Sequence, residues 1–173
     1  MVNDETVAQF CLMPNDDVSN KHGIKLKNYY TLCICSASRG VILTGRYDIF
    51  NGLQGIATQG SKRGVSLQIK LISDYLANRP YNYSNYFIGK WHIGKYDWKQ
   101  TPTHRGFKYF YGMLGGASDY FTHITGQKKY DWHEHIGFNC NNTDCARLVI
   151  ENYNKYSTTL SSSKAIQIIK NSS

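Results

Sequence analysis

A cysteine, two serines and an arginine fall within the five residues Cys35 to Arg39, directly before an apolar run that starts at Val41. Serines suit the start of a helix, where unpaired backbone N–H groups favour an anion. A cysteine there, four residues before a guanidinium, would be suited to act as a nucleophile or to line an anion pocket. The structural alternative is a capped helix with a buried thiol, and these five residues alone favour it.

The segments on either side of this motif predict how it is held. Residues 24–35 alternate in polarity and are rich in Tyr, Leu and Ile, which predicts a strand or extended segment. The hydroxyls of Ser36 to Ser38 are expected to cap a short apolar helix. Gly45 is expected to end that helix as its C-cap.

The rest of the chain predicts alternating helix and strand. Apolar spacing indicates a helix over 66–78, and the short apolar run 86–91 fits a buried strand, so an α/β sheet is expected. Residues 95–135 show little period and predict a long, loop-rich segment of the kind that lines sites. A last helix is predicted over 158–170, with four residues facing inward: Leu160, Ala165, Ile166 and Ile169.

The charge of the chain restricts its partners. The net charge of +8 favours anionic partners such as nucleic acid, acidic lipid or sulfated glycans. The sequence contains no recognisable nucleic-acid module, so no nucleic-acid partner is expected. No apolar run approaches the roughly 20 residues that span a bilayer, and the acidic N-terminus lacks the apolar stretch of a signal peptide.

The cysteines and three asparagines carry covalent predictions. Five cysteines are an odd number, so one is free or used for another purpose. If that one is Cys35, Cys140 and Cys145 are close enough to close a small loop; five unrelated thiols in a reducing compartment are the alternative. Three triplets match the N-glycosylation acceptor pattern, at Asn82, Asn141 and Asn171.

The histidines were weighed as metal ligands. Residues 131–135, Asp-Trp-His-Glu-His, place two histidines two residues apart with acids beside them, which is weak evidence for a transition-metal site. We interpret this stretch as a polar loop, and the same interpretation extends to the other histidines of the region, His104 and His123.

Residues beyond the first motif give it a family context. Cys-x-Pro-Ser-Arg-x-x-x-Leu-Thr-Gly-Arg is the sulfatase signature, and the chain resembles it at Cys35, Ser38, Arg39, Leu43, Thr44, Gly45 and Arg46. Flanking blocks resemble arylsulfatase B (N-acetylgalactosamine-4-sulfatase) and its close relatives: KNYYTLC, YDIFNGLQ, GKWHIGKY, TPTHRGFKYFYG and SDYF. The blocks keep the family's order, and the resemblance covers about residues 24 to 170.

The resemblance implies a fold and a reaction. The fold would be an alkaline-phosphatase-like α/β domain with a mainly parallel central sheet flanked by helices. Cys35 would be converted by the formylglycine-generating enzyme to formylglycine, whose hydrate is a diol. One hydroxyl would attack the sulfate sulfur, and the second would allow sulfate to be eliminated, which splits one difficult step into two.

The resemblance also implies roles for individual residues. Arg39 would hold the modified residue and stabilise its oxygen. Lys90 would contact a sulfate oxygen, and His92 would bond the formylglycine hydroxyl and act as general base. A calcium ion would be held by the formylglycine at Cys35, with the Asp16–Asp17 pair as weak candidates. Arg105 is expected to support the fold rather than contact substrate.

Three departures from the family pattern stand out. Ala37 replaces the proline that helps the modifying enzyme recognise the cysteine. Asp16–Asp17 lie only 18 residues before Cys35, too close for the family's metal strand. The family's later Asp-Asn pair, second histidine and second lysine do not occur. We therefore expect a partial domain, with 1–23 an atypical N-terminal segment and 24–173 part of the N-terminal catalytic domain.

Two functions follow as expectations. The first is a sulfuric ester hydrolase of the arylsulfatase type, acting on sulfated glycosaminoglycans or aryl sulfates, in the lysosome or secreted. The second is an inactive, sulfatase-like fragment that binds sulfated glycans through basic residues such as Arg39, Arg46 and Lys90 without hydrolysing them.

Overall fold

A computed structural model describes residues 23–24, 26–55, 61–140, 142 and 145–172. The chain divides into two units, Met1–Thr31 and Leu32–Ser173. Residues 24–35 were predicted to form a strand or an extended segment; the described residues of the first unit contain no helix or strand, so no strand forms there. A strand needs a neighbouring strand to pair with, and all four strands of the described sheet lie between residues 86 and 148.

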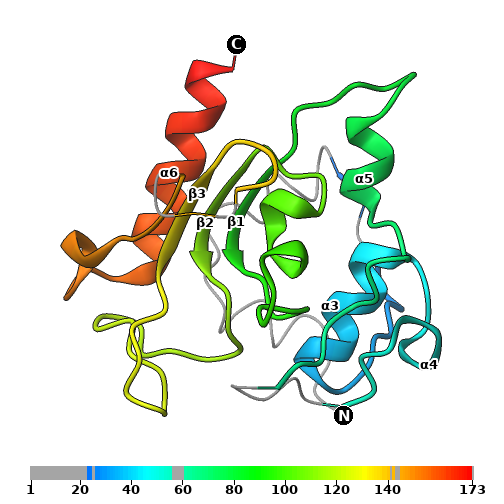
Figure 1. The fold of residues 1–173 in the computed structure, drawn as a ribbon, viewed down its shortest axis with the longest axis horizontal. Helices are drawn as coiled ribbons and strands as arrows, with labels where there is room; N and C mark the ends of the chain where they lie inside the picture. Colours follow the sequence, from blue (N-terminus) through cyan, green and yellow to red (C-terminus); the bar gives the residue numbers. More distant parts are fainter. Residues whose placement is uncertain (1–22, 25, 56–60, 141, 143–144, 173) are drawn as a thin grey trace. The chain divides into compact units, whose positions relative to one another are not determined.

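The sheet of the second unit has four strands in the order β1-β2-β3-β4 (Figure 1). The strands are β1 (Tyr86–Lys90), β2 (Tyr109–Met113), β3 (His133–Ile136) and β4 (Ala146–Leu148). β1 and β2 are parallel, whereas β2–β3 and β3–β4 are antiparallel. The α/β class is confirmed, but the described sheet is mixed rather than mainly parallel, and the described residues between β2, β3 and β4 contain no crossover helix.

Helices cover both faces of this sheet. α6 (Ser157–Asn171) packs on β1 and β2 from one side, while α3 (Cys35–Thr44), α4 (Asp48–Asn51) and α5 (Ile72–Ala77) lie on the other side (Figure 1). Strand alternation divides the core accordingly. Phe110 faces the cluster built around Trp91, and Tyr111 faces the cluster under Leu160 of α6. Short 3-10 turns complete the unit at Trp98–Gln100, Pro102–His104 and Ile150–Asn152.

The helix predicted over 66–78 is shorter than expected. α5 begins only at Ile72, where the Asp74 carboxylate accepts the Leu71 N–H at 2.8 Å. The buried Arg105 guanidinium donates hydrogen bonds to the carbonyls of Val65 and Ile69 at 3.3 and 2.6 Å, and the residues between these two carbonyls form a turn rather than a helix. The expectation that Arg105 supports the fold agrees with these contacts.

α6 confirms the last predicted helix, but its inward face differs from the prediction. Leu160 packs in the core and Ala165 is half-buried, as expected, whereas Ile166 and Ile169 are 53% and 70% exposed. The helix is rotated so that Lys164 points to the sheet, where its Nζ lies 3.3 Å from Oε1 of Glu134.

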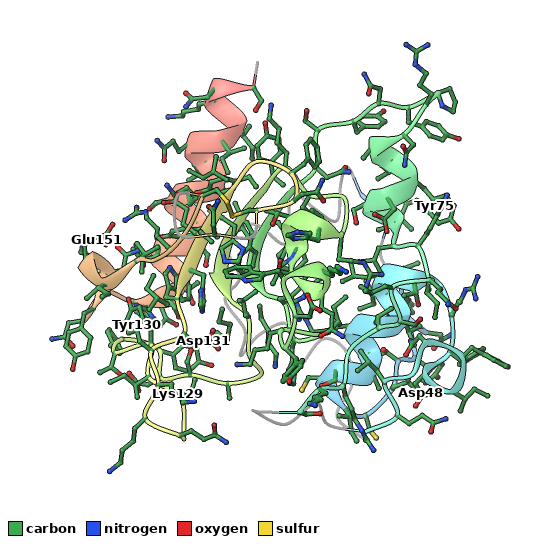
Figure 2. All side chains as sticks on the ribbon, in the orientation of Figure 1. Asp48, Tyr75, Lys129, Tyr130, Asp131 and Glu151 are labelled. Atoms are coloured by element: carbon green, nitrogen blue, oxygen red, sulfur yellow. A yellow bond between two sulfur atoms is a disulfide. The ribbon has the colours of Figure 1, made fainter. Side chains whose placement is uncertain are left out.

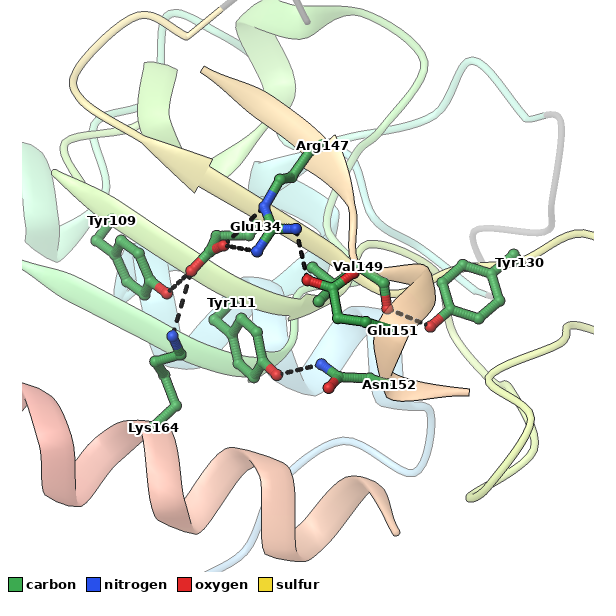
Figure 3. Close-up of polar contacts among 9 residues, drawn as sticks. All are labelled: Tyr109, Tyr111, Tyr130, Glu134, Arg147, Val149, Glu151, Asn152 and Lys164. Atoms are coloured by element: carbon green, nitrogen blue, oxygen red, sulfur yellow. Dashed lines mark hydrogen bonds and ion pairs between the residues drawn. The ribbon is translucent and has the colours of Figure 1, made fainter. Parts of the chain in front are cut away.

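Glu134 joins α6 to three strands (Figure 3). Its buried carboxylate accepts a hydrogen bond from the Tyr109 hydroxyl and two from the Arg147 guanidinium, at 3.0 and 2.7 Å. Burial acts to raise the pKa of Glu134, but Tyr109, Arg147 and Lys164 outweigh it and lower that pKa. Burial and Glu134 together raise the pKa of Tyr109.

The structure bears on the predicted disulfide and on whether a helix could span a membrane. Cys140 and Cys145 form a disulfide that closes the connection between β3 and β4, which confirms the expected pairing. Among the described residues, the helices are all too short or too polar to cross a bilayer.

Candidate active site

Cys35 is the first residue of α3 and is exposed. The residue before it, Ile34, is extended at φ −114°, and its carbonyl accepts the Ser38 N–H at 2.9 Å, which starts the helix. Ser36 and Ser38 therefore lie inside the first turn, and the prediction that they cap the helix is wrong. Gly45 does end the helix, at φ 66°, as predicted.

His92 lies against Cys35. Its Nδ1 is 3.2 Å from Sγ of Cys35, and the Ser36 hydroxyl lies 3.2 to 3.3 Å from its two ring nitrogens. The side chain is buried, and its backbone has φ 59°, in a left-handed region that costs free energy for a residue other than glycine. The fold thus holds an imidazole at hydrogen-bond distance from the reactive group.

The backbone after β1 determines where His92 lies. Trp91 is fully buried in the core and its N–H donates to the Met113 carbonyl at 2.9 Å. The His92 N–H donates to the Leu114 carbonyl at 3.2 Å. A Cβ added at Gly116 would overlap the His92 ring, so the Leu114–Gly116 segment forms a close wall behind the imidazole.

Arg39 links α3 to the end of β1. Its Nε donates to the Trp91 carbonyl at 2.9 Å, and its Nη2 donates to the Lys90 carbonyl. Burial lowers the pKa of Arg39, and the neighbouring Cys35 opposes this shift. The structure therefore brings Cys35, Arg39 and His92 together, and it joins Lys90 to them through its backbone carbonyl.

Asp131, which is labelled in Figure 2, was considered in the sequence only as part of the 131–135 stretch. In the structure it binds the Leu114–Gly115 segment behind His92. The buried carboxylate accepts the N–H groups of Leu114 and Gly115 at 3.1 and 2.8 Å. It also lies 3.0 Å from Nε2 of His133 and 3.7 Å from Nζ of Lys95.

The electrostatics of Asp131 follow from these contacts. Burial acts to raise its pKa, but the hydrogen bond from His133 and the charge of Lys95 outweigh burial and lower it. One sequence feature could have pointed to a contact at this segment: the Gly115–Gly116 pair after an apolar strand. Paired glycines often mark a place where the backbone comes close to another group, here the Asp131 carboxylate.

The interpretation of 131–135 as a polar loop is wrong. His133 and His135 belong to β3, which pairs with β2 on one side and with β4 on the other. His123 and His135 are buried, and burial, followed by His133 and His104, lowers the pKa of His135 to about 4. His104 lies in the turn Pro102–His104.

The predicted calcium ligands cannot be placed. Asp16 and Asp17 lie outside the described residues. The described part of the chain contains no group of three or more His, Cys, Asp or Glu residues that would hold a metal ion. Calcium favours six to eight oxygen ligands, whereas the side chains that contact Cys35 and Arg39 here supply an imidazole and no carboxylate. The described residues alone do not fit a calcium site, so no chemical step is assigned to a metal.

The predicted glycosylation sites are placed in part. Asn82 and Asn171 are exposed, whereas Asn141 lies outside the described residues.

Comparison with known proteins gives the site its context. The family model described as Sulfatase matches residues 7–173. Arylsulfatase J of Mus musculus is 39% identical over 111 residues, covering 64% of this chain and 18% of that protein. Human steryl-sulfatase is 32% identical over 112 residues, covering 58% and 19%.

Solved structures agree with this likeness. The crystal structure of Ps i-CgsB superimposes with a TM-score of 0.60 and 26% identity over 80% of this chain and 31% of that one. The PsFucS1 sulfatase from Pseudoalteromonas sp. gives a TM-score of 0.54 and 29% identity, over 68% and 23%. The chain thus spans less than a third of the length of each of these proteins. The finer likeness to arylsulfatase B stays a prediction.

Proposed function

Because the chain belongs to the sulfatase family, we propose that it hydrolyses sulfate esters through a formylglycine formed from Cys35. The observation that carries the proposal is the 3.2 Å contact between Sγ of Cys35 and Nδ1 of His92. In the modified protein, the Cβ of residue 35 would be the aldehyde carbon and an oxygen would replace Sγ. At the formylglycine-generating enzyme, dioxygen would be the oxidant: one oxygen atom would become the carbonyl oxygen, and the sulfur would leave as hydrogen sulfide.

The first step is attack on sulfur. One hydroxyl of the hydrated aldehyde attacks the sulfate sulfur, the bond from sulfur to the alcohol oxygen breaks, and the alcohol leaves with a proton. The Arg39 guanidinium, fixed on the carbonyls of Trp91 and Lys90, supplies positive charge beside residue 35. Lys90, at the end of β1, is the candidate contact for a sulfate oxygen.

The second step releases sulfate. His92 takes the proton of the remaining hydroxyl, the carbon–oxygen bond to sulfate breaks, and the aldehyde forms again. The 3.2 Å separation is within the reach of a general base. A serine at position 35 would lack the second hydroxyl and would stay sulfated.

The substrate and the compartment are parts of this proposal. Sulfated glycosaminoglycans and aryl sulfates are the substrate classes, supported by the net charge of +8. Ps i-CgsB has also been crystallised in complex with k-i-k-neocarrahexaose. The Cys140–Cys145 disulfide supports a lysosomal or secreted location, since disulfides persist in oxidising compartments. Calcium and glycosylation at Asn82, Asn141 and Asn171 stay predictions.

The test uses the chain co-expressed with the formylglycine-generating enzyme. We expect the peptide containing residue 35 to carry the aldehyde mass and the protein to turn over 4-nitrophenyl sulfate. Cys35→Ala should abolish turnover, whereas Cys33→Ala, which removes the other exposed free thiol among the described residues, should keep it. An unmodified thiol together with no turnover would refute the proposal. Salt-sensitive binding of heparin without turnover would favour the inactive, glycan-binding alternative.

A further inference from the structure

A pocket of about 920 Å³ is lined by residues that follow β1 and β2 and by residues of β3 and β4. Its wall includes three aromatic residues and three residues from the sheet edge: Tyr96, Trp98, Tyr130, Leu114, His133 and Leu148. No role has been assigned to this pocket above. Its size is that of a site for a small organic ligand.

The pocket and the active site share a wall. Leu114 lines the pocket, and its carbonyl accepts the N–H of His92. Two residues further on, Gly116 lies directly against the His92 ring. Lys90 ends β1, and His133 and Leu148 are paired where β3 begins and β4 ends, so all three lie at one edge of the sheet. Ligands of α/β sheets bind at this carboxyl edge of the parallel strands.

The charges of the pocket are compensated. Lys95, a lining residue, is paired with Asp131, which also bonds His133. The guanidinium of Arg147 forms ion pairs with the carboxylates of Glu134 and Glu151. Lys62, whose Nζ lies over the Tyr96 ring, is not part of the lining.

Two further lining residues make the pocket less suited to an anion. Asp97 adds a carboxylate, and His135 is neutral near pH 7 because its pKa is lowered to about 4. A chain of net charge +8 therefore carries a pocket without a surplus of positive charge.

The aromatic residues offer flat apolar surfaces. Trp98 is 44% exposed and Tyr96 is 59% exposed. The rings of such residues pack against flat apolar faces of a ligand. The Trp indole N–H and the Tyr hydroxyl can in addition form a hydrogen bond with a hydroxyl group of that ligand. His135 is buried in the lining, and its Nδ1 has no hydrogen-bond partner within the described residues.

We propose that this pocket binds the alcohol part of the sulfate ester, and that this part is an uncharged ring with an apolar face. The proposal rests on the proposed function and narrows it. An aryl ring and an uncharged sugar ring share the required chemistry. A ring that carries a second sulfate or a carboxylate would be repelled by the Asp97 carboxylate. The cations of the lining, Lys95 and Arg147, are already paired with other carboxylates.

The binding test needs no turnover. The chain has three tryptophans, and Trp91 and Trp132 are at most 1% exposed, so an NMR signal of the Trp98 indole N–H can report occupancy. We expect phenol, which like the Tyr side chain is uncharged at pH 7, and N-acetylgalactosamine to shift this signal, each reporting one source of the ring. Glucuronic acid, a charged ring of similar size, should shift it much less.

Two variants and a control sharpen the test. Tyr96→Ala should weaken binding of the neutral rings by up to about tenfold, the range of one aromatic contact. Leu148→Lys should place an unpaired cation in the lining and allow glucuronic acid to bind. Tyr47→Ala removes an aromatic residue that is 67% exposed but does not line the pocket, and it should change neither result.

The outcomes separate this proposal from the proposed function. If 4-nitrophenyl sulfate is hydrolysed, Tyr96→Ala should raise KM and leave kcat unchanged. Turnover with an unaltered KM in Tyr96→Ala would overturn the pocket while leaving the sulfatase reaction intact. Glucuronic acid binding as tightly as the neutral rings, or no Trp98 shift with either neutral ring, would also overturn it. A Trp98 shift without turnover would support the pocket and count against the activity.

Discussion

Sγ of Cys35 and Nδ1 of His92 lie 3.2 Å apart although 57 residues separate them in the chain. One comes from the first turn of α3 and the other from the residues after β1. Arg39 holds the two segments together because its guanidinium, on α3, binds the carbonyls of Lys90 and Trp91. Changes to either segment should therefore be measurable as changes in turnover.

Ala37→Pro should increase the fraction of Cys35 that is converted to formylglycine. Residue 37 is the third residue of α3, in the first turn, where proline is tolerated because its N–H has no intrahelical partner. The family signature has proline at this position. The measurement is the mass of the residue 35 peptide after co-expression with the modifying enzyme. Ala37→Gly is the control, and equal conversion in both variants would contradict the prediction.

Gly116→Ala should lower kcat by about 100-fold, the effect of a displacement near 1 Å at a reacting group. The added Cβ would overlap the His92 ring and push it away from residue 35. Gly126→Ala is the control, since no atom lies within 4 Å of its added Cβ. Thermal unfolding of both variants should be followed, and an unchanged kcat in a folded Gly116→Ala protein would refute the role of this wall.

Asp131→Asn should reduce kcat by roughly tenfold, because the neutral amide holds the N–H groups of Leu114 and Gly115 less tightly than a carboxylate does. A shift of the His92 NMR signals would show that the effect passes through the imidazole. Asp119→Asn is a matched control: its carboxylate also accepts two backbone N–H groups, from Phe121 and Thr122, but it is exposed. Equal losses in the two variants would argue against positioning.

Glu134→Gln should destabilise the fold by about 2 kcal/mol at pH 7, because the buried acceptor of Tyr109, Arg147 and Lys164 loses its charge. The folded-state pKa of Glu134 lies below its usual 4.5, so its contribution is full above that value and is lost as pH falls through the folded-state pKa. The difference in the free energy of unfolding between Glu134→Gln and the unchanged protein should therefore become smaller at acidic pH.

Denaturant unfolding at several pH values measures this effect. Glu151→Gln is the control, because Glu151 pairs with the same Arg147 but is 55% exposed, and exposed pairs contribute about 0.5 kcal/mol. A gap for Glu134→Gln that stays constant down to pH 3 would contradict the assignment.

The sequence was informative where local pattern decides structure. The apolar run 86–91 matches the position of β1, although β1 is half-buried at the edge of the described sheet rather than buried as predicted. The last helix matches α6, and the spacing of Cys140 and Cys145 matches the disulfide. In each case the signal lies within a few residues. The contact between Cys35 and His92 agrees with a role implied by resemblance, although it spans 57 residues.

The errors arose where a distant partner decides. The helix predicted from residue 66 begins only at Ile72, and the Ile69 carbonyl before it binds Arg105, which lies 36 residues further along the chain. The inward face of α6 is fixed by the pairing of Lys164 with Glu134, which apolar spacing does not record. His133 and His135 form a strand because β2 and β4 flank them. Asp131 is informative only once Leu114 and Gly115 are seen to fold over it.

The two hydrogen bonds of Arg39 affect which residue a related protein would change first if it lost catalytic activity. This guanidinium fastens α3 to the sheet, so replacing it would loosen the fold as well as the reaction. Cys35 is exposed, and its replacement would cost the fold little. A related protein that no longer needs catalytic activity would therefore tend to change residue 35 first and to keep Arg39 because the fold depends on it.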